Sequence, residues 1–167
     1  MEHSGNIATK PEKIECVFVR EVTLRYKGPR RGESFNPILS PQKAADFMAR
    51  IFPDNVREHF LTLFLDGQKH VVAFFVTATG TASSCLVGTK ELFQAAVVAG
   101  ASSVIVGHNH PSGEPIPSQE DRAVTKRLAQ AGELLGIPVL DHLILGTSGF
   151  YSFNEHGEMP QELGINL

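Results

Sequence analysis

Three stretches of the chain repeat their apolar residues at the spacing of an α-helix. The first begins after Ser40, a typical N-cap residue, and ends at Pro53. The second begins with Thr89 as its expected cap, and the third begins at Ser118 and ends at Gly136. The apolar positions are Ala44, Phe47, Met48, Ile51 and Phe52 in the first, Leu92, Phe93, Ala96 and Val97 in the second, and Val124, Leu128, Ala131 and Leu135 in the third.

Short apolar runs rich in β-branched and aromatic residues predict strands between these helices. Residues 60–76 form two runs around a turn at Asp66-Gly67, and both runs are nearly continuous, so we expect a sheet covered on both faces. Further strands are expected at residues 102–107, 139–146 and 150–153. Helices that alternate with buried strands predict an α/β fold with a single mixed β-sheet flanked by helices.

The ends of the chain differ in pattern from this central part. The first residues are polar, a run at 16–26 favours a strand, and the segment that follows is rich in Gly and Pro. We therefore expect an N-terminal strand and loop extension, a main domain and a C-terminal tail, at residues 1–37, 38–155 and 156–167.

The composition is that of a globular domain with little electrostatic preference. Of 167 residues, 42% are hydrophobic, which is enough for a core, and the net charge of −3 gives no general reason to expect a nucleic-acid or membrane partner. The polar first residues lack the apolar stretch of a signal peptide, and no apolar run approaches a membrane span. Two cysteines make no disulfide framework, so a reduced cytoplasmic protein is the expectation.

The segment HNHPSGEPIPSQED, residues 108–121, carries the candidate chemistry. Residues two apart in an extended segment point to the same side, so His108 and His110 can face one point. Asp121 falls in the first turn of the third predicted helix, on the face that packs inward. Two imidazoles and one carboxylate, with a fourth position open for water, are the ligands of a catalytic zinc site.

A helix start explains part of this segment without a metal. Ser118 suits the N-cap, and an acid such as Asp121 is favoured in the first turn by the helix dipole. A cap does not require two histidines at the end of a hydrophobic strand. The two interpretations are compatible, because Ser118 can begin the helix while the same turn directs Asp121 towards a metal.

The spacing of His108, His110, Ser118 and Asp121 resembles the JAMM motif of the JAB/MPN metalloprotease superfamily. The whole string, with LLGIPVLDHLILG after it, resembles the RadC-like branch, and the likeness runs over about residues 38–155. It implies a fold related to that of cytidine deaminases and one zinc ion on the two histidines and Asp121. It also implies that Ser118 donates a hydrogen bond to the oxyanion. A deaminase itself is set aside, because the chain lacks the Pro-Cys-x-x-Cys of those enzymes.

A zinc hydrolase also needs a carboxylate to accept the proton of a water molecule whose pKa the metal lowers to about 7. In JAMM proteins this glutamate opens an apolar strand upstream of the histidines, and Glu58 in REHFLTLFLD stands in that setting. Glu91 matches an Arg/Lys-Glu pair of the RadC-like branch, but helix capping also explains an acid there. We choose Glu58 as the base, keep Glu91 as the alternative, and treat Glu114 and Glu120 as exposed charges.

The remaining candidate groups have structural interpretations. Asp141 and His142 are neighbours on a predicted strand and face opposite ways, so at most one approaches the site, and a buried polar role is favoured. His59 and His70 are expected at the surface or rim of the hairpin. Cys85 is expected to act as a small buried hydrophobe.

The leading hypothesis is a zinc-dependent hydrolase that cleaves a peptide or isopeptide bond in a protein substrate. The first alternative is a DNA-metabolism accessory protein of the RadC type, whose metal is not used for proteolysis. Its DNA contact would come from a basic cluster, but the N-terminal helix-hairpin-helix of many RadC-like proteins is not predicted here. A catalytically silent MPN scaffold ranks last, because all three ligands and the serine are present. The oligomeric state stays open, and the basic cluster consists of Arg25, Lys27, Arg30 and Arg31.

Overall fold

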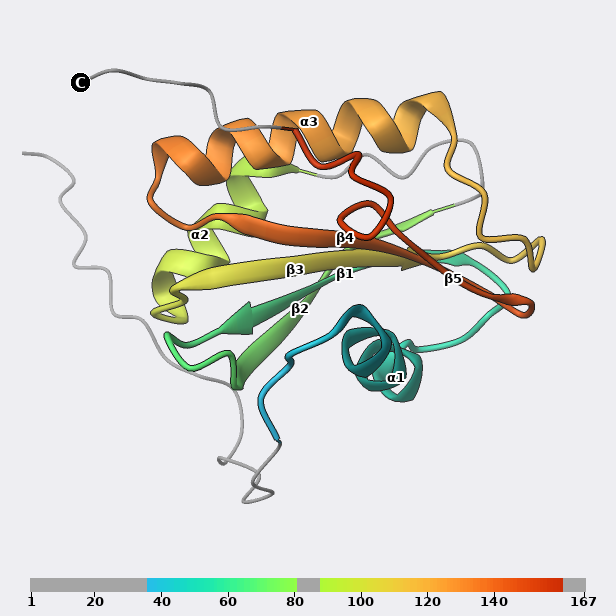
Figure 1. Cartoon of the computed structure of the whole chain (residues 1–167), viewed down its shortest axis with the longest axis horizontal. Coiled ribbons are helices and arrows are strands. Elements are labelled where there is room, and N and C mark those ends of the chain that lie inside the picture. Colours follow the sequence, from blue (N-terminus) through green and yellow to red (C-terminus); the bar gives the residue numbers. More distant parts are fainter. Residues whose placement is uncertain (1–35, 81–87, 161–167) are drawn as a thin grey trace, which may run out of the picture. The chain divides into compact units, whose positions relative to one another are not determined.

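A computed structural model describes residues 36–80 and 88–160 of the chain (Figure 1). The predicted strand at 16–26, the basic cluster and Cys85 fall outside these residues. The elements in chain order are α1 (Pro41–Ile51), β1 (Glu58–Leu65), β2 (Val71–Gly80), α2 (Thr89–Val98), β3 (Ser103–Asn109), α3 (Gln119–Leu134), β4 (Val139–Gly146) and β5 (Gly149–Ser152).

The strands form one mixed sheet in the order β2-β1-β3-β4-β5. The pair β3–β4 is parallel, and the other three pairs are antiparallel. A parallel pair needs a crossover connection, and α3 supplies it between β3 and β4. The crossover begins near the carboxyl end of β3, so the first turn of α3 lies close to the residues that leave that strand. The mixed sheet with flanking helices confirms the predicted fold class.

Helices cover both faces of the sheet, with α1 on one face and α2 and α3 on the other (Figure 1). Each side has its own apolar cluster. The α1 side consists of Ile38, Ala44, Ala45, Met48, Leu61, Leu63, Leu65, Ile105 and Leu143. The α2–α3 side consists of Phe60, Phe64, Leu92, Phe93, Ala96, Ala101, Val104, Val106, Leu128, Ile137 and Val139.

The two strands of the predicted hairpin differ in burial. Every residue of β1 after Glu58 is buried, as the continuous apolar run predicts. The expectation for β2 was wrong, because β2 is an edge strand of the described sheet and leaves Val72, Phe74 and Phe75 exposed. An apolar run does not distinguish a central strand from an edge strand, since that depends on which neighbours it acquires.

The helix starts follow the sequence signals with one exception. Ser40 caps α1 through its hydroxyl, which accepts from the Lys43 amide, and Ser118 caps α3. Thr89 is the first residue of α2 and not its cap, because Gly88 holds the N-cap position and the Thr89 hydroxyl accepts from Arg127 Nε instead.

The end of α3 also departs from expectation. Leu135 was predicted on the apolar stripe, but it follows the last helical residue and is 53% exposed. The rest of the stripe faces the core: Leu128 is buried and Val124 and Ala131 pack against the core, and the helix also buries Thr125 and Gly132. An added Cβ at Gly132 would lie 2.5 Å from the Ile137 carbonyl oxygen, so the glycine permits this close approach. Over the ranges that the structure covers, no helix is both long and apolar enough to cross a membrane.

Candidate metal centre

Three elements meet where β3 ends. The strand runs two residues further than its apolar run predicted and includes His108, whose side chain lies on the same side as Val104 and Val106. The His110 amide then donates to the Leu145 carbonyl of β4 at 2.8 Å, which fixes the start of the following loop. The strand end and the first turn of α3 therefore place the motif residues on the α2–α3 side of the sheet.

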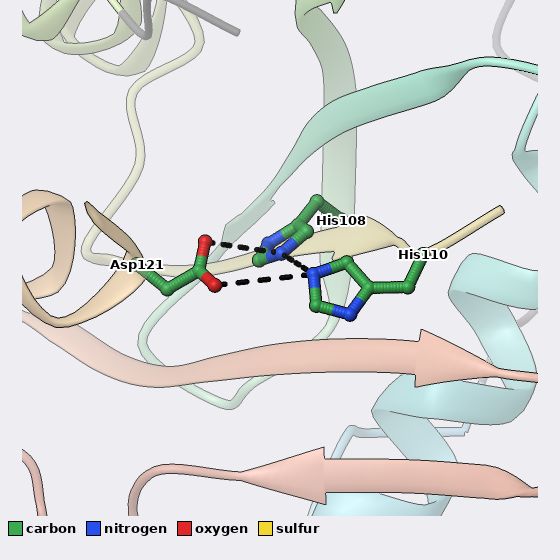
Figure 2. A group of neighbouring side chains, drawn as sticks. All are labelled: His108, His110 and Asp121. Carbon is green, nitrogen blue, oxygen red and sulfur yellow. Dashed lines mark hydrogen bonds and ion pairs between the residues drawn. The ribbon is translucent and has the colours of Figure 1, made fainter. Parts of the chain in front are cut away.

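His108, His110 and Asp121 converge on one point, as Figure 2 shows. His108 Nε2 lies 3.0 Å from His110 Nε2 and 3.2 Å from Asp121 Oδ1, and His110 Nε2 lies 3.9 Å from Asp121 Oδ2. Ligand atoms around a tetrahedral zinc ion at about 2.0–2.1 Å are spaced about 3.3 Å apart. The three side chains could therefore hold a metal ion, and the capping of α3 by Ser118 is compatible with Asp121 facing that point.

Hydrogen bonds at the far side of each imidazole leave both Nε2 atoms free to bind a metal. His110 Nδ1 lies 2.8 Å from the Glu114 carbonyl oxygen, which can only accept, so Nδ1 carries the proton. His108 Nδ1 lies 2.9 Å from His142 Nε2. The direction of that second bond follows from the partners of His142.

A buried chain of hydrogen bonds sets the proton on His108. The Thr125 hydroxyl donates to the Asp121 carbonyl oxygen at 2.6 Å, so it accepts from His142 Nδ1, also at 2.6 Å. A neutral His142 then has an unprotonated Nε2, which accepts from His108 Nδ1–H. The lone pair of His108 lies on Nε2, the atom that faces His110 and Asp121. Metal-binding histidines are commonly oriented by such a partner on the second nitrogen.

Burial favours the neutral imidazoles that this chain requires. Removal from water lowers the pKa of His108 to about 4, and His110 acts in the same direction while the Asp121 carboxylate opposes it. Burial also holds the pKa of His142 well below its ordinary value. Neutral imidazole is the form that binds metal, so the site does not have to lose protons from these two rings near neutral pH.

Glu58 opens β1 beside this centre. The last paired residues of β1 and β3 are Phe60 and His108, and continuing that register by two residues sets Glu58 opposite His110. Burial and then the negative charge of Asp121 raise the pKa of Glu58, and His110 opposes them. These influences place the carboxylate within electrostatic reach of the site. By contrast, Glu91, Glu114 and Glu120 are exposed.

Ser118 is engaged in the helix cap. Its hydroxyl donates to Asp121 Oδ2 at 2.6 Å and accepts from the Asp121 amide at 3.1 Å, and its own amide donates to the same carboxylate oxygen. The single hydroxyl proton is therefore committed to Asp121 in this arrangement. Donation from Ser118 to an oxyanion stays a prediction, and it requires that proton to leave Asp121.

Residues 38–158 match the family model described as RadC-like JAB domain. The chain belongs to the RadC-like JAB family. A UPF0758 protein of Geotalea uraniireducens is 41% identical over 150 residues, which are 89% of this chain and 65% of that protein. A UPF0758 protein of Trichlorobacter lovleyi is 44% identical over 128 residues, 77% of this chain and 56% of the relative. The chain thus spans less than two thirds of these relatives, whose names state no activity. The resemblance seen in the motif is confirmed.

One histidine of this RadC-like JAB domain differs from the sequence expectation. His59 is buried and not at the rim: its Nδ1 lies 3.1 Å from Thr79 Oγ1, and its Nε2 lies 3.2 Å from Asp54 Oδ1 without hydrogen-bond geometry. Backbone donation from Arg57, with help from His59, lowers the pKa of Asp54 to about 2. The continuous apolar run after Glu58 could have indicated that His59, the second residue of β1, is buried.

His142 is fully buried, as the favoured sequence interpretation expected, and it also contacts His108. It lies on β4, next to β3, on the same side of the sheet as His108. Its neighbour Asp141 faces the other way and accepts from the His142 and Asn154 amides and the Ser152 hydroxyl. Asp141 therefore ties the strand β4 to β5 and the following turn, while His142 contacts His108 of the candidate metal centre.

Proposed function

We propose that this RadC-like JAB domain is a zinc-dependent hydrolase that cleaves an amide bond, of the peptide or isopeptide type, in a protein substrate. The observation that carries the proposal is the convergence of His108 Nε2, His110 Nε2 and the Asp121 carboxylate on one point, with Glu58 beside it. We also propose a reduced cytoplasmic setting, because two cysteines make no disulfide framework.

The residues of the chain divide the work. A bound zinc ion would polarise the scissile carbonyl and bring the pKa of a water molecule to about 7. Glu58 accepts the proton of the attacking water and delivers it to the leaving amine nitrogen. Its raised pKa suits this task, since a base is most effective when its pKa approaches the working pH. Ser118 would donate its hydroxyl proton to the oxyanion.

Metal content and catalysis test this proposal in sequence. We expect about one zinc per chain in the purified protein and a loss of stoichiometric zinc in His108→Ala and Asp121→Ala. Against a panel of peptide and isopeptide substrates, Glu58→Gln should keep its zinc and lose about 10²–10⁴-fold in kcat. Glu91→Gln is the matched control, because it removes the same charge from an exposed helix start.

Four results would contradict parts of the proposal. Wild-type protein that binds no more zinc than the two ligand variants contradicts the metal site. Full activity in Glu58→Gln removes that residue as the base, and a loss in Glu91→Gln would transfer the role to Glu91. Zinc binding without cleavage of any amide substrate contradicts the hydrolase.

The DNA-metabolism alternative rests on the basic cluster of the N-terminal extension. If the cluster contacts DNA, binding should weaken steeply with salt, because phosphate contacts release condensed counterions. A double Arg30→Ala and Arg31→Ala variant should lose that binding while retaining zinc. Salt-independent or absent DNA binding would contradict this alternative.

A further inference from the structure

We propose that Asn109, the residue between the two histidine ligands, is a positioning residue that holds the backbone of Glu58 at the metal centre. The inference rests on the proposed function, in which Glu58 is the base. Asn109 is buried, and both polar atoms of its side chain bind the backbone at the start of β1, one at His59 and one at Arg57, the residue before the strand. The side chain thus links the strand that carries the ligands to the strand that carries the base.

The two hydrogen bonds fall on either side of Glu58. Asn109 Oδ1 accepts from the His59 amide at 2.8 Å, and Asn109 Nδ2 donates to the Arg57 carbonyl oxygen at 2.9 Å. The Arg57 carbonyl belongs to the peptide group that precedes the Glu58 Cα, and the His59 amide belongs to the one that follows it. With both peptide groups held, the direction in which the Glu58 side chain leaves the backbone is constrained.

This contact replaces strand pairing at the place where the ladder stops. The paired residues of β1 and β3 end at Phe60 and His108, one step before Asn109 and two before Glu58. On its other side Glu58 is paired with Gly80 of β2, a strand that carries none of the ligands. Asn109 therefore supplies the direct connection between the backbone of the base and β3, and it sits in the chain between His108 and His110.

Positioning of this kind matters because displacement of a catalytic group by about 1 Å can cost about 10²-fold in rate. The buried side-chain amide of Asn109 binds both partners at once, because it donates to the Arg57 carbonyl oxygen and accepts from the His59 amide. Asparagine can do so because its side chain holds a carbonyl oxygen and an amino group at the same short distance from the backbone. Alanine at position 109 offers neither group, and aspartate offers only acceptors.

The activity test is a double-mutant cycle between Asn109→Ala and Glu58→Gln. We expect Asn109→Ala to lower kcat about 10- to 100-fold with little change in KM and with zinc stoichiometry retained. In the Glu58→Gln background the same substitution should cost less than about 3-fold, because the group it positions is already inactive. Asn109→Asp, which keeps the size and the acceptor for the His59 amide, should fall between wild type and Asn109→Ala.

Thr62→Val is the matched control for a loss of stability alone. Thr62 lies on β1, as Glu58 does, and its hydroxyl is 3.1 Å from the Thr77 hydroxyl of β2. The substitution removes this contact and does not affect the hydrogen bonds of the peptide groups around Glu58. We expect its kcat to stay within about 2-fold of wild type. Equal losses of kcat in Thr62→Val and Asn109→Ala would assign the effect to the strand in general and overturn the positioning role.

Amide hydrogen exchange tests the contact without any substrate. In zinc-loaded protein, Asn109→Ala should speed exchange of the His59 amide at least about 10-fold, while Asn109→Asp and Thr62→Val leave it protected. Unchanged protection of His59 in Asn109→Ala overturns the proposal whatever the activity. If Asn109→Ala loses protection of the His59 amide but lowers kcat by the same factor in the wild-type and Glu58→Gln backgrounds, the contact is confirmed and its role through Glu58 is overturned. A wild type that hydrolyses nothing contradicts the proposed function itself, and the exchange data then still decide the contact.

Discussion

The two faces of the central strand β3 serve different purposes. Ile105 and Gly107 pack towards α1, where the cluster is wholly apolar. On the opposite face Val104 and Val106 begin an apolar cluster, but His108 continues it with a polar ring. One strand therefore contributes to a core cluster on both sides, and on one of them it also supplies the residues of the candidate metal centre. The difference between the faces arises on the α2–α3 side, where the residue type changes from apolar at Val106 to a candidate metal ligand at His108.

The core of the α1 face is formed by closely packed apolar side chains. Met48 is fully buried, and an added Cβ at Gly107 would lie 2.6 Å from its sulfur. The other face holds polar groups in place with rings and hydrogen bonds. Phe60 stacks on His108 at 5.9 Å between ring centroids, and Phe153 stacks on His142 at 4.9 Å. Buried polar groups cost little when they are satisfied, and on this face hydrogen bonds join Thr125, His142 and His108 Nδ1.

The largest expected effect is a loss of folding stability on the α1 face that leaves the candidate metal centre on the other face unchanged. Met48→Ala should lower the free energy of unfolding by about 2–5 kcal/mol, because it leaves a cavity beside Gly107. Zinc bound per folded chain should not change, since Met48 contacts the face opposite the ligands. Denaturant unfolding combined with metal analysis measures both quantities. Loss of zinc from the folded variant would show that the faces are coupled.

The next effect is the response of the zinc-free protein to acid. The folded pKa values of His108 and His142 are depressed, so below about pH 6.5 the unfolded chain binds protons that the folded chain does not. Stability from these groups is therefore present above pH 6.5 and is lost as the pH falls towards about 4. Urea unfolding with a chelator should show a loss of about 2–4 kcal/mol from these two groups between pH 6.5 and pH 5.

Variants on each face sharpen this result. His142→Gln should flatten the dependence of unfolding free energy on pH, because one of the two depressed groups is gone. Met48→Ala should lower stability equally at both pH values and keep the wild-type slope. A wild-type slope in His142→Gln would mean that this ring does not titrate on unfolding as its burial requires.

The smallest expected effect concerns metal affinity. Thr125→Val keeps the shape of the side chain and removes the acceptor for His142 Nδ1–H. His108 then loses the constraint that keeps its proton on Nδ1, and we expect zinc affinity to fall about 10- to 100-fold. Competition with a chromophoric chelator measures the change. Thr62→Val should leave affinity unaltered, and an equal fall in both variants would rule out the chain through His142.

Local patterns predicted most of the fold. The helices after Ser40 and Ser118 begin where capping residues indicated, because an N-cap acts through amides only two or three residues away. The placement of β2 at an edge, the burial of His59 and the exposure of Leu135 were missed. Each of these depends on which distant segments of the chain pack beside the residue, and the polarity of a residue in the sequence does not contain that information.

By itself, the sequence determined the candidate ligand set and the order of elements that brings it together. A strand ending in two histidines two residues apart, followed by a capped helix with an acid in its first turn, is local information. Only the tertiary structure decided which nitrogen of His108 faces the site, through Thr125 and His142, and how Asn109 holds the peptide groups around Glu58. Those contacts join residues 17 to 52 positions apart, and their geometry exists only once β1, β3, β4 and α3 pack together.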